Sequence, residues 1–420
     1  MITVASSPIQ DALAERFLRY SAISSQSDAS STTVPTSEGQ WELARLLKRE
    51  LEEAGAEAIH LSDTCVLTAK VPSNLPGNAV APAIGFCTHL DTVDVNLSPD
   101  VKARVIEYDG GDVCLNQAND VWMRESEHPE IARYKGERIL VTDGTSVLGA
   151  DDKAGVTSVM EAAVRLLQDP TVPHGDVYLS FVPDEEIGLR GVRTMDLARF
   201  PVEYAFTLDS CELGEVVESA FNAASVRIDI VGVSAHPMNS KGNLVNPILI
   251  AHDIIAQFDR RETPECTEGR ESYIWVNAVE GNQTTAHIGI AVRDHDRAGY
   301  EEKKQRIRDS AARVSQAHPR AKVTVDIEDV YGNIEDAKTE ENAVATDNIV
   351  KAMAQLGIEP IHLSMRGGTD GSWLSRQGIF TPNFFTGAHN FHSVFEFLPL
   401  NAFEKSFEMV NTLIRQAAQQ

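Results

Sequence analysis

Three short apolar segments of this chain are each followed, at their carboxyl ends, by acidic or histidine side chains. The segments are residues 83–88, 177–182 and 204–208, and the side chains that follow them are His89 and Asp91, Glu185 and Glu186, and Asp209. Apolar runs of this length between polar stretches are typical of buried strands. In an open α/β sheet, ligands bind beyond the carboxyl ends of the strands. The sequence therefore predicts an α/β fold with a site at one sheet edge.

A further acidic pair, Asp151-Asp152, comes just before a predicted helix at residues 154–168, in which apolar residues recur every three or four positions. Each of these groups also has a purely structural interpretation. In Asp151-Asp152 one residue could be the N-cap of the helix and the other its neighbour. Glu185-Glu186 could lie in a solvated turn, and His89 could be a structural histidine. Taken together, these side chains would crowd one sheet edge with negative charge that a cation would stabilise. Imidazole and carboxylate donors favour zinc, or else manganese or cobalt, over calcium or magnesium.

The remaining pattern indicates two domains. After Ala220, residues 226–231 change to the alternation of a half-buried strand, which predicts an inserted two-layer α+β domain at 222–330 within a larger domain formed by 1–221 and 331–420. Further elements are predicted as helices at 41–54, 246–258, 300–317, 342–356 and from 401 onward, strands at 272–279, 287–292 and 379–385, a glycine-rich loop at 366–371, and loops with short strands at 92–144.

The chain is strongly acidic, with 37 lysines and arginines against 62 aspartates and glutamates among 420 residues, a formal net charge of −25. This charge repels phosphate backbones and anionic lipid surfaces, so nucleic acid and membrane are excluded as partners. No run reaches the roughly 18 apolar residues of a membrane span, and the first residues carry charges where a signal peptide would be apolar. A cytoplasmic location is predicted.

Five longer motifs carry a resemblance to a known family. They are LGADDKAG, FVPDEEIG, ESAFNAAS, MRGGTDGS and FFTGAHNFH, in this order. With them the chain resembles the peptidase T family, tripeptide aminopeptidases of the di-zinc aminoacylase and carboxypeptidase-like clan. The resemblance implies a mixed-sheet zinc-peptidase catalytic domain, an inserted lid or dimerisation domain, and a homodimer.

The resemblance also implies two zinc ions per subunit, with Mn²⁺ or Co²⁺ as possible substitutes. Their ligands would be His89 and Asp209 at one ion, Glu186 and His392 at the other, and Asp151 between both. Three carboxylates and a bridging hydroxide neutralise two divalent ions, which supports this ligand set independently. In similar proteins the peptide bond that joins Asp151 to Asp152 is cis.

Catalytic and substrate-binding roles follow from the same resemblance. Asp91 would orient His89, a zinc-bridging water would attack the substrate with Glu185 as general base, and His236 would stabilise the oxyanion in the neighbouring subunit's site. The candidates for binding the peptide are Arg293, Arg366, Lys241 and Asn243. For Arg366, an arginine that ties a loop to the backbone is the alternative.

Two points stay open at this stage. On spacing alone either His389 or His392 could be the ligand, although the family pattern favours His392. The segment 388–397 and the pair Ser210-Cys211 depart from the family pattern, which puts the preferred peptide length in doubt. The predicted function is an aminopeptidase that releases the N-terminal residue from tripeptides and other short peptides. The alternatives are a dipeptidase, an N-acyl-amino-acid amidohydrolase, or a peptide-binding protein without turnover.

Overall fold

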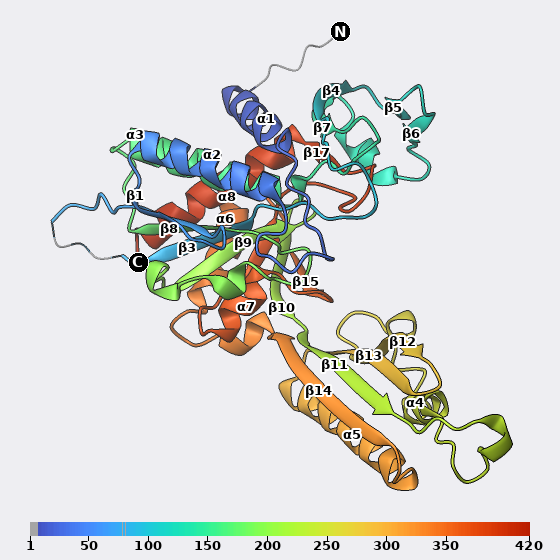
Figure 1. The fold of residues 1–420 in the computed structure, drawn as a ribbon. Helices are drawn as coiled ribbons and strands as arrows, with labels where there is room; N and C mark the ends of the chain where they lie inside the picture. Colours follow the sequence, from blue (N-terminus) through green and yellow to red (C-terminus); the bar gives the residue numbers. More distant parts are fainter. Residues whose placement is uncertain (1–6, 78, 80) are drawn as a thin grey trace. The chain divides into compact units, whose positions relative to one another are not determined.

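The computed structural model describes residues 7–77, 79 and 81–420, which fold into two compact units (Figure 1). The larger unit comprises Met1–Glu218, Ala337–Leu363 and Thr369–Gln420, and the inserted unit comprises Ser219–Asp336 and Ser364–Gly368. The sequence places the inserted domain at 222–330, whereas the inserted unit also includes the short segment Ser364–Gly368. The catalytic role of one domain and the lid or dimerisation role of the other stay predictions. In the part of the chain that is described, no helix has both the length and the apolar character that crossing a bilayer requires.

The larger unit is built on a mixed eight-stranded sheet. Its strand order is β1 (Glu57–Leu61), β2 (Leu67–Val71), β8 (Val177–Val182), β3 (Ile84–His89), β9 (Tyr204–Ser210), β16 (Asn383–Phe385), β10 (Glu215–Ala220) and β15 (Ile361–Met365). The three predicted strands are neighbours, because β3 pairs in parallel with both β8 and β9. All three are buried along nearly their whole length, as their apolar sequences require. The predicted α/β mixed-sheet fold is confirmed.

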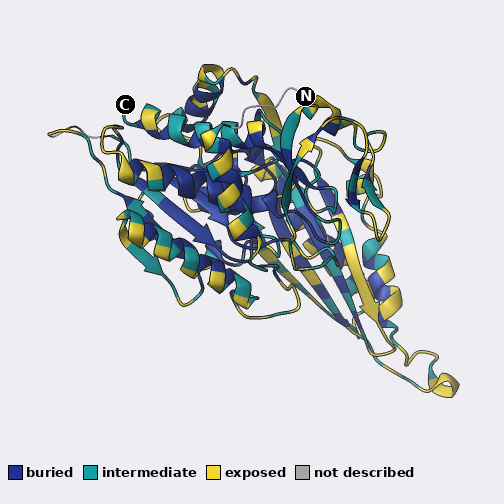
Figure 2. Ribbon diagram, turned by 90° about the horizontal axis from the view of Figure 1, so that it is seen from above, coloured by how far each residue is buried: buried dark blue, intermediate teal, exposed yellow. Residues whose placement is uncertain are grey.

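Helices of the larger unit cover this sheet. They are α1 (Pro8–Ser21), α2 (Glu38–Ala54), α3 (Ala150–Gln168), α6 (Val344–Gln355), α7 (Asp370–Arg376) and α8 (Leu400–Ala417). Helix α3 lies at the centre, in contact with α1, α2 and α8 and with strands β3 and β9. Figure 2 shows the central strands of the sheet in the buried colour, whereas helices such as α1, α2 and α8 alternate between buried and more exposed residues.

Two predicted elements differ in detail from the observed ones. Helix α3 begins at Ala150 rather than 154, but Asp151 and Asp152 have non-helical backbone angles and a cis peptide bond between them, so the regular helix starts after both. The predicted glycine-rich loop ends earlier than expected, because Asp370 is the first residue of α7. The side chain of Thr369 caps this helix by accepting a hydrogen bond from the Gly371 N–H.

The segment predicted as loops and short strands forms a small lobe. It contains η1 (Pro129–Tyr134), the hairpin β5 (Val113–Asn116) and β6 (Val121–Met123), and the strands β4 (Arg104–Tyr108) and β7 (Glu137–Val141). Strand β7 also pairs with β17 (Phe397–Pro399). The lobe therefore fixes the chain that follows His392, one of the predicted metal ligands.

The inserted unit has two layers. Its antiparallel sheet has the order β12 (Tyr273–Gly281), β13 (Thr285–Asp294), β11 (Asn222–Val231) and β14 (Lys322–Tyr331). Helices α4 (Pro247–Ile255) and α5 (Arg297–Ala317) pack on it and close an aliphatic core that includes Ile228, Ile288 and Ile307. This is the two-layer α+β architecture that the sequence predicts.

Candidate metal centre

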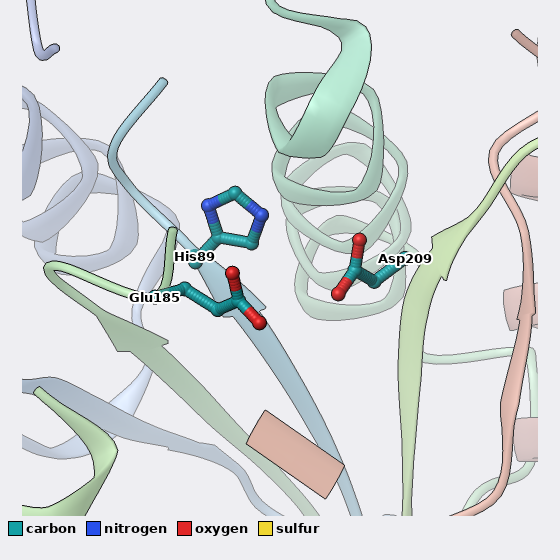
Figure 3. A group of neighbouring side chains, drawn as sticks. All are labelled: His89, Glu185 and Asp209. Atoms are coloured by element: carbon teal, nitrogen blue, oxygen red, sulfur yellow. The ribbon is translucent and has the colours of Figure 1, made fainter. Parts of the chain in front are cut away.

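The three central strands bring their polar ends to one place. His89 is the last residue of β3, Glu185 follows β8, and Asp209 is the penultimate residue of β9. Figure 3 shows the three side chains gathered around one space beside α3. One donor atom from each residue lies within 4.8 Å of the other two, which is close enough for a shared metal ion.

Asp151 lies between two imidazoles. One carboxylate oxygen, Oδ1, is 2.9 Å from Nε2 of His89, and the other, Oδ2, is 3.0 Å from Nε2 of His392. Nε2 of His392 is also 3.1 Å from a carboxylate oxygen of Glu186, and donor atoms of His89, Asp151 and Glu186 form a second group within 4.8 Å. A carboxylate that offers one oxygen to each side has the geometry of a ligand shared by two ions.

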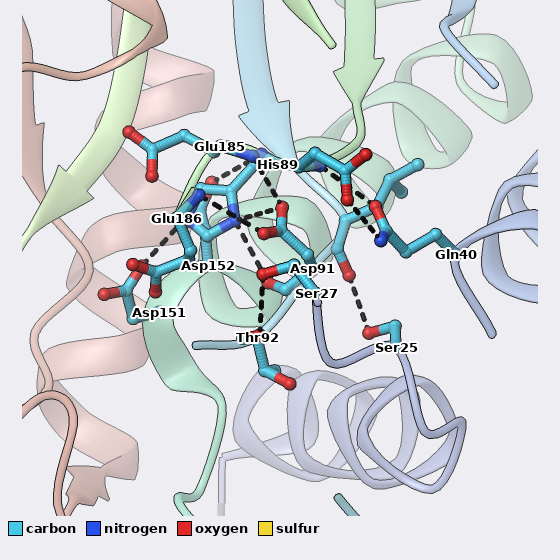
Figure 4. Close-up of polar contacts among 12 residues, drawn as sticks. Ser25, Ser27, Gln40, His89, Asp91, Thr92, Asp151, Asp152, Glu185 and Glu186 are labelled. Atoms are coloured by element: carbon cyan, nitrogen blue, oxygen red, sulfur yellow. Dashed lines mark hydrogen bonds and ion pairs between the residues drawn. The ribbon is translucent and has the colours of Figure 1, made fainter. Parts of the chain in front are cut away.

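Asp91 holds two parts of this centre (Figure 4). Its main-chain oxygen is 3.0 Å from Nδ1 of His89, closer than its carboxylate oxygen at 3.4 Å. Its carboxylate accepts hydrogen bonds from the main-chain N–H groups of Glu185 and Glu186, at 2.9 and 3.2 Å. A proton on Nδ1 of His89 leaves the Nε2 lone pair free for a metal. Asp91 thus contacts His89 and also holds the turn of the two glutamates through hydrogen bonds, and its role in orienting His89 stays a prediction.

The turn before Glu185 has further supports that the sequence analysis did not identify. Asp184 is fully buried and has a φ of 55°, an uncommon conformation for a residue other than glycine. Its carboxylate accepts hydrogen bonds from Gln40 (2.7 Å) and Thr36 (2.6 Å), and its N–H donates to Gln40 (3.0 Å). Because these partners lie about 150 residues earlier in the chain, no local pattern could reveal them.

The electrostatics of the centre favour a cation. Burial, together with the neighbouring carboxylates, raises the pKa of Glu185 and of Asp209 well above the ordinary values and that of Glu186 to about 7. Hydrogen bonds to Asp151 and Glu186 raise the pKa of His392 to about 11. A divalent cation would relieve the repulsion among these carboxylates, and the donor set of two imidazoles and several carboxylates fits zinc, manganese or cobalt.

The five further candidates all belong to the inserted unit. His236, Lys241 and Asn243 are exposed, and Nδ1 of His236 accepts a hydrogen bond from the Met238 N–H at 3.3 Å. Arg293 is partly buried and donates to the main-chain oxygens of Val292 and Ala224, at 3.0 and 3.3 Å.

Arg366, the fifth candidate, is engaged in a loop contact. Its guanidinium donates to the Gly269 carbonyl at 3.0 Å and to Oγ1 of Thr267 at 2.8 Å, and it lies 5.4 Å from the ring centres of Phe221 and Tyr273. These contacts match the alternative in which the arginine ties a loop to the backbone. A role in binding the peptide therefore stays a prediction for Arg366, as it does for Arg293, Lys241 and Asn243, and the oxyanion role stays a prediction for His236.

The two candidate histidines of the segment 388–397 have different surroundings. The side chain of His392 reaches Asp151 and Glu186, as described above, and is 44% exposed. His389 is buried, forms a 2.6 Å hydrogen bond with the hydroxyl of Tyr134, and stacks on Phe397 with ring centres 4.8 Å apart. The geometry therefore favours His392 as the ligand.

We expect the buried His389 to make the stability of the protein depend on pH. Burial lowers its pKa from 6.5 to about 4, against the opposing charge of Glu212. Below about pH 6.5 the imidazole of His389 becomes protonated in the unfolded chain but stays neutral in the folded protein. The free energy of unfolding should therefore fall by up to roughly 3 kcal/mol as the pH drops towards 4. In urea unfolding at several pH values, His389→Phe should flatten this slope, whereas substitution of the exposed His252 by glutamine should not. An unchanged slope in His389→Phe would contradict the prediction.

Comparison with known proteins defines the class. Residues 147–416 match the model of Peptidase family M20/M25/M40. The chain is 51% identical to a peptidase T-like protein of Yersinia pestis, with 98% of each chain covered, and 39% identical to peptidase T of Geobacillus kaustophilus, with 96% of this chain and 97% of that one covered. The chain therefore belongs to peptidase family M20/M25/M40. It is an enzyme, a hydrolase, and the predicted family resemblance is confirmed.

Solved structures show the same fold. Aminopeptidase PepT from Bacillus cereus superposes with a TM-score of 0.75 at 22% identity, covering 97% of this chain and 99% of that one. A tripeptidase from Staphylococcus aureus gives the same TM-score at 20% identity, covering 98% and 99%. At such identities the similarity establishes the fold, and substrates need a separate argument.

Proposed function

We propose that the protein is a metal-dependent aminopeptidase that releases the N-terminal residue from tripeptides and other short peptides. The observation that carries this proposal is the placement of the Asp151 carboxylate between the imidazoles of His89 and His392, with Glu185 beside it. The name of the relatives, peptidase T, supports the substrate class, because the resemblance to that family implies tripeptides.

In this proposal His89 and Asp209 hold one ion, Glu186 and His392 hold the other, and Asp151 is shared. The ions are two Zn²⁺ per subunit, which Mn²⁺ or Co²⁺ can replace. When bound, such a pair polarises the scissile carbonyl and lowers the pKa of a water molecule. The exposure of the His392 side chain leaves this side of the centre open to a substrate.

Glu185 acts as the general base. Its carboxylate belongs to the same donor group as His89 and Asp209, yet it is left out of the ligand set, so it is available to take a proton from the attacking water and pass it to the leaving amine. Asp91 keeps Glu185 in place through the hydrogen bond to its main-chain N–H. No nucleophilic serine or cysteine is needed.

Substrate binding is assigned to the inserted unit. Arginine and lysine donors suit the carboxylate of a short peptide, and the candidates are Arg293, Arg366 and Lys241, with Asn243 as a neutral donor. His236 is proposed to stabilise the oxyanion in the active site of a second subunit. Its exposed position in the loop before α4 leaves the imidazole accessible for this role.

A homodimer is part of the proposal. The inserted unit exposes large apolar side chains on α4 and on the edge strand β12, which are Ile248, Leu249, Trp275 and Val279. An edge strand with exposed apolar side chains is suited to pairing with another chain. In sedimentation experiments the wild type should be a dimer, and the variant Leu249→Glu should be mainly a monomer. A monomeric wild type would contradict the proposal.

A cytoplasmic location stays a prediction from the sequence.

The experiment that tests the function is hydrolysis of di-, tri- and tetrapeptides with free and with acetylated amino termini. Tripeptides with a free amino terminus should be cleaved fastest, with release of the first residue. Full activity on acetylated peptides would instead favour an N-acyl-amino-acid amidohydrolase, and a preference for dipeptides would favour a dipeptidase.

A further inference from the structure

Glu396 is a buried carboxylate to which the sequence analysis gave no role. It is 1% exposed. Its Oε2 accepts hydrogen bonds from the main-chain N–H groups of Leu148 (2.6 Å) and Gly149 (2.9 Å), and its Oε1 accepts from those of Ala150 (2.8 Å) and Asp151 (3.3 Å). Four consecutive N–H groups thus converge on one side chain, which is the arrangement of a backbone anion-binding nest.

The conformation of the turn makes this convergence possible. Gly149 has a φ of 71°, in the left-handed region, and a Cβ added there would lie 2.9 Å from a side-chain carbon of Thr92. The turn therefore directs its N–H groups inwards, where water cannot reach them. A buried N–H group without a partner costs free energy, so the turn depends on an acceptor from elsewhere in the chain.

Glu396 is itself anchored. Its N–H donates to the carbonyl of Ser393 at 3.2 Å, and the next residue, Phe397, begins β17 and pairs with Val141 of β7. The segment from His392 to Glu396 therefore supplies one candidate ligand directly and holds the backbone of a second, Asp151, through the carboxylate.

We propose that Glu396 is a positioning residue that fixes the main chain at Asp151 and thereby sets the affinity of the centre for its two metal ions. This inference rests on the proposed function. An anion suits the site because all four partners are donors, and a carboxylate offers two acceptor oxygens to them. A glutamine would place an NH₂ group against two of these donors and would push the turn away.

The test is a titration of the metal-depleted full chain with Co²⁺, followed by its visible absorption, together with thermal unfolding of the metal-free protein. Glu396→Gln should bind Co²⁺ about 10- to 100-fold more weakly than the wild type, as outer-sphere substitutions do, and should change the absorption spectrum. The matched control is Glu161→Gln. Glu161 is also a buried carboxylate and accepts from Arg16 and Arg165 instead, so this variant should keep the wild-type affinity and spectrum.

Wild-type affinity and spectrum in Glu396→Gln would overturn the inference, as would an equal loss in Glu161→Gln. If Glu396→Gln does not fold, the same titration is made with Glu396→Asp. This variant keeps the negative charge, but its side chain is one methylene shorter, so the carboxylate lies farther from the four N–H groups. A weaker affinity with an altered spectrum in this variant supports the inference, and wild-type values overturn it. A wild type that binds no Co²⁺ would instead overturn the proposed function itself.

Discussion

Glu185→Gln should lower the rate of tripeptide hydrolysis by about 10²- to 10⁴-fold, the usual contribution of a general base, while the bound metal stays unchanged. The reason is that glutamine keeps the size of the side chain and the N–H contact to Asp91 but cannot accept the proton of the attacking water. The measurement is kcat on a tripeptide, together with the metal content of the same preparation by elemental analysis.

A matched control is Glu212→Gln. Glu212 follows Asp209 by three residues and lies 3.6 Å from His389, outside both donor groups of the centre. Its substitution should change kcat far less than that of Glu185. Near wild-type activity in Glu185→Gln would remove the base assignment, and loss of metal in this variant would make Glu185 a ligand instead.

Removal of the metal should abolish hydrolysis and also destabilise the larger unit. Without a cation, the carboxylates of Asp151, Glu185, Glu186 and Asp209 repel one another in a mostly buried site. Metal at a thousand times its dissociation constant stabilises a folded protein by about 4 kcal/mol per site. Dialysis against a chelator should therefore lower the melting temperature as well as the activity.

Readdition of Zn²⁺, Mn²⁺ or Co²⁺ should restore both properties, and readdition of Ca²⁺ should restore neither, because the donor set includes two imidazoles. Activity measurements and thermal unfolding on the same samples check this. Full activity after chelation, with no metal found by elemental analysis, would contradict the proposed metal-dependent mechanism.

Much of the fold could be predicted because its elements carry strong local signals. Strand β8 has the predicted limits, and helix α2 ends before Gly55, whose φ of 92° is the left-handed conformation expected of a helix stop. Helix α1 was missed although its signals are present, with Ser7 as N-cap and Pro8 at the first helical position.

Other elements carry no strong local signal. Strand β1 has no fully buried residue, and the burial of β2 comes from its pairing with β8 rather than from a long apolar run. For these two strands the pairing partner is the missing information. Strand β14 is different, because its alternation of polar and apolar residues beside β11 is a local signal of a half-buried strand that was missed.

In the candidate site, too, some features follow from local sequence signals and others only from the packing of the chain. The sequence by itself determined which strand ends carry acids and histidines, because apolar runs and the residues that follow them are local features. Only the tertiary structure decided that Asp151 lies between His89 and His392, 62 and 241 residues away. It also decided that Gln40 supports Asp184 and that Glu396 holds the turn before Asp151. The physical reason is that a side chain's partners are set by how the strands and helices pack, and the local pattern around each residue contains no record of that packing.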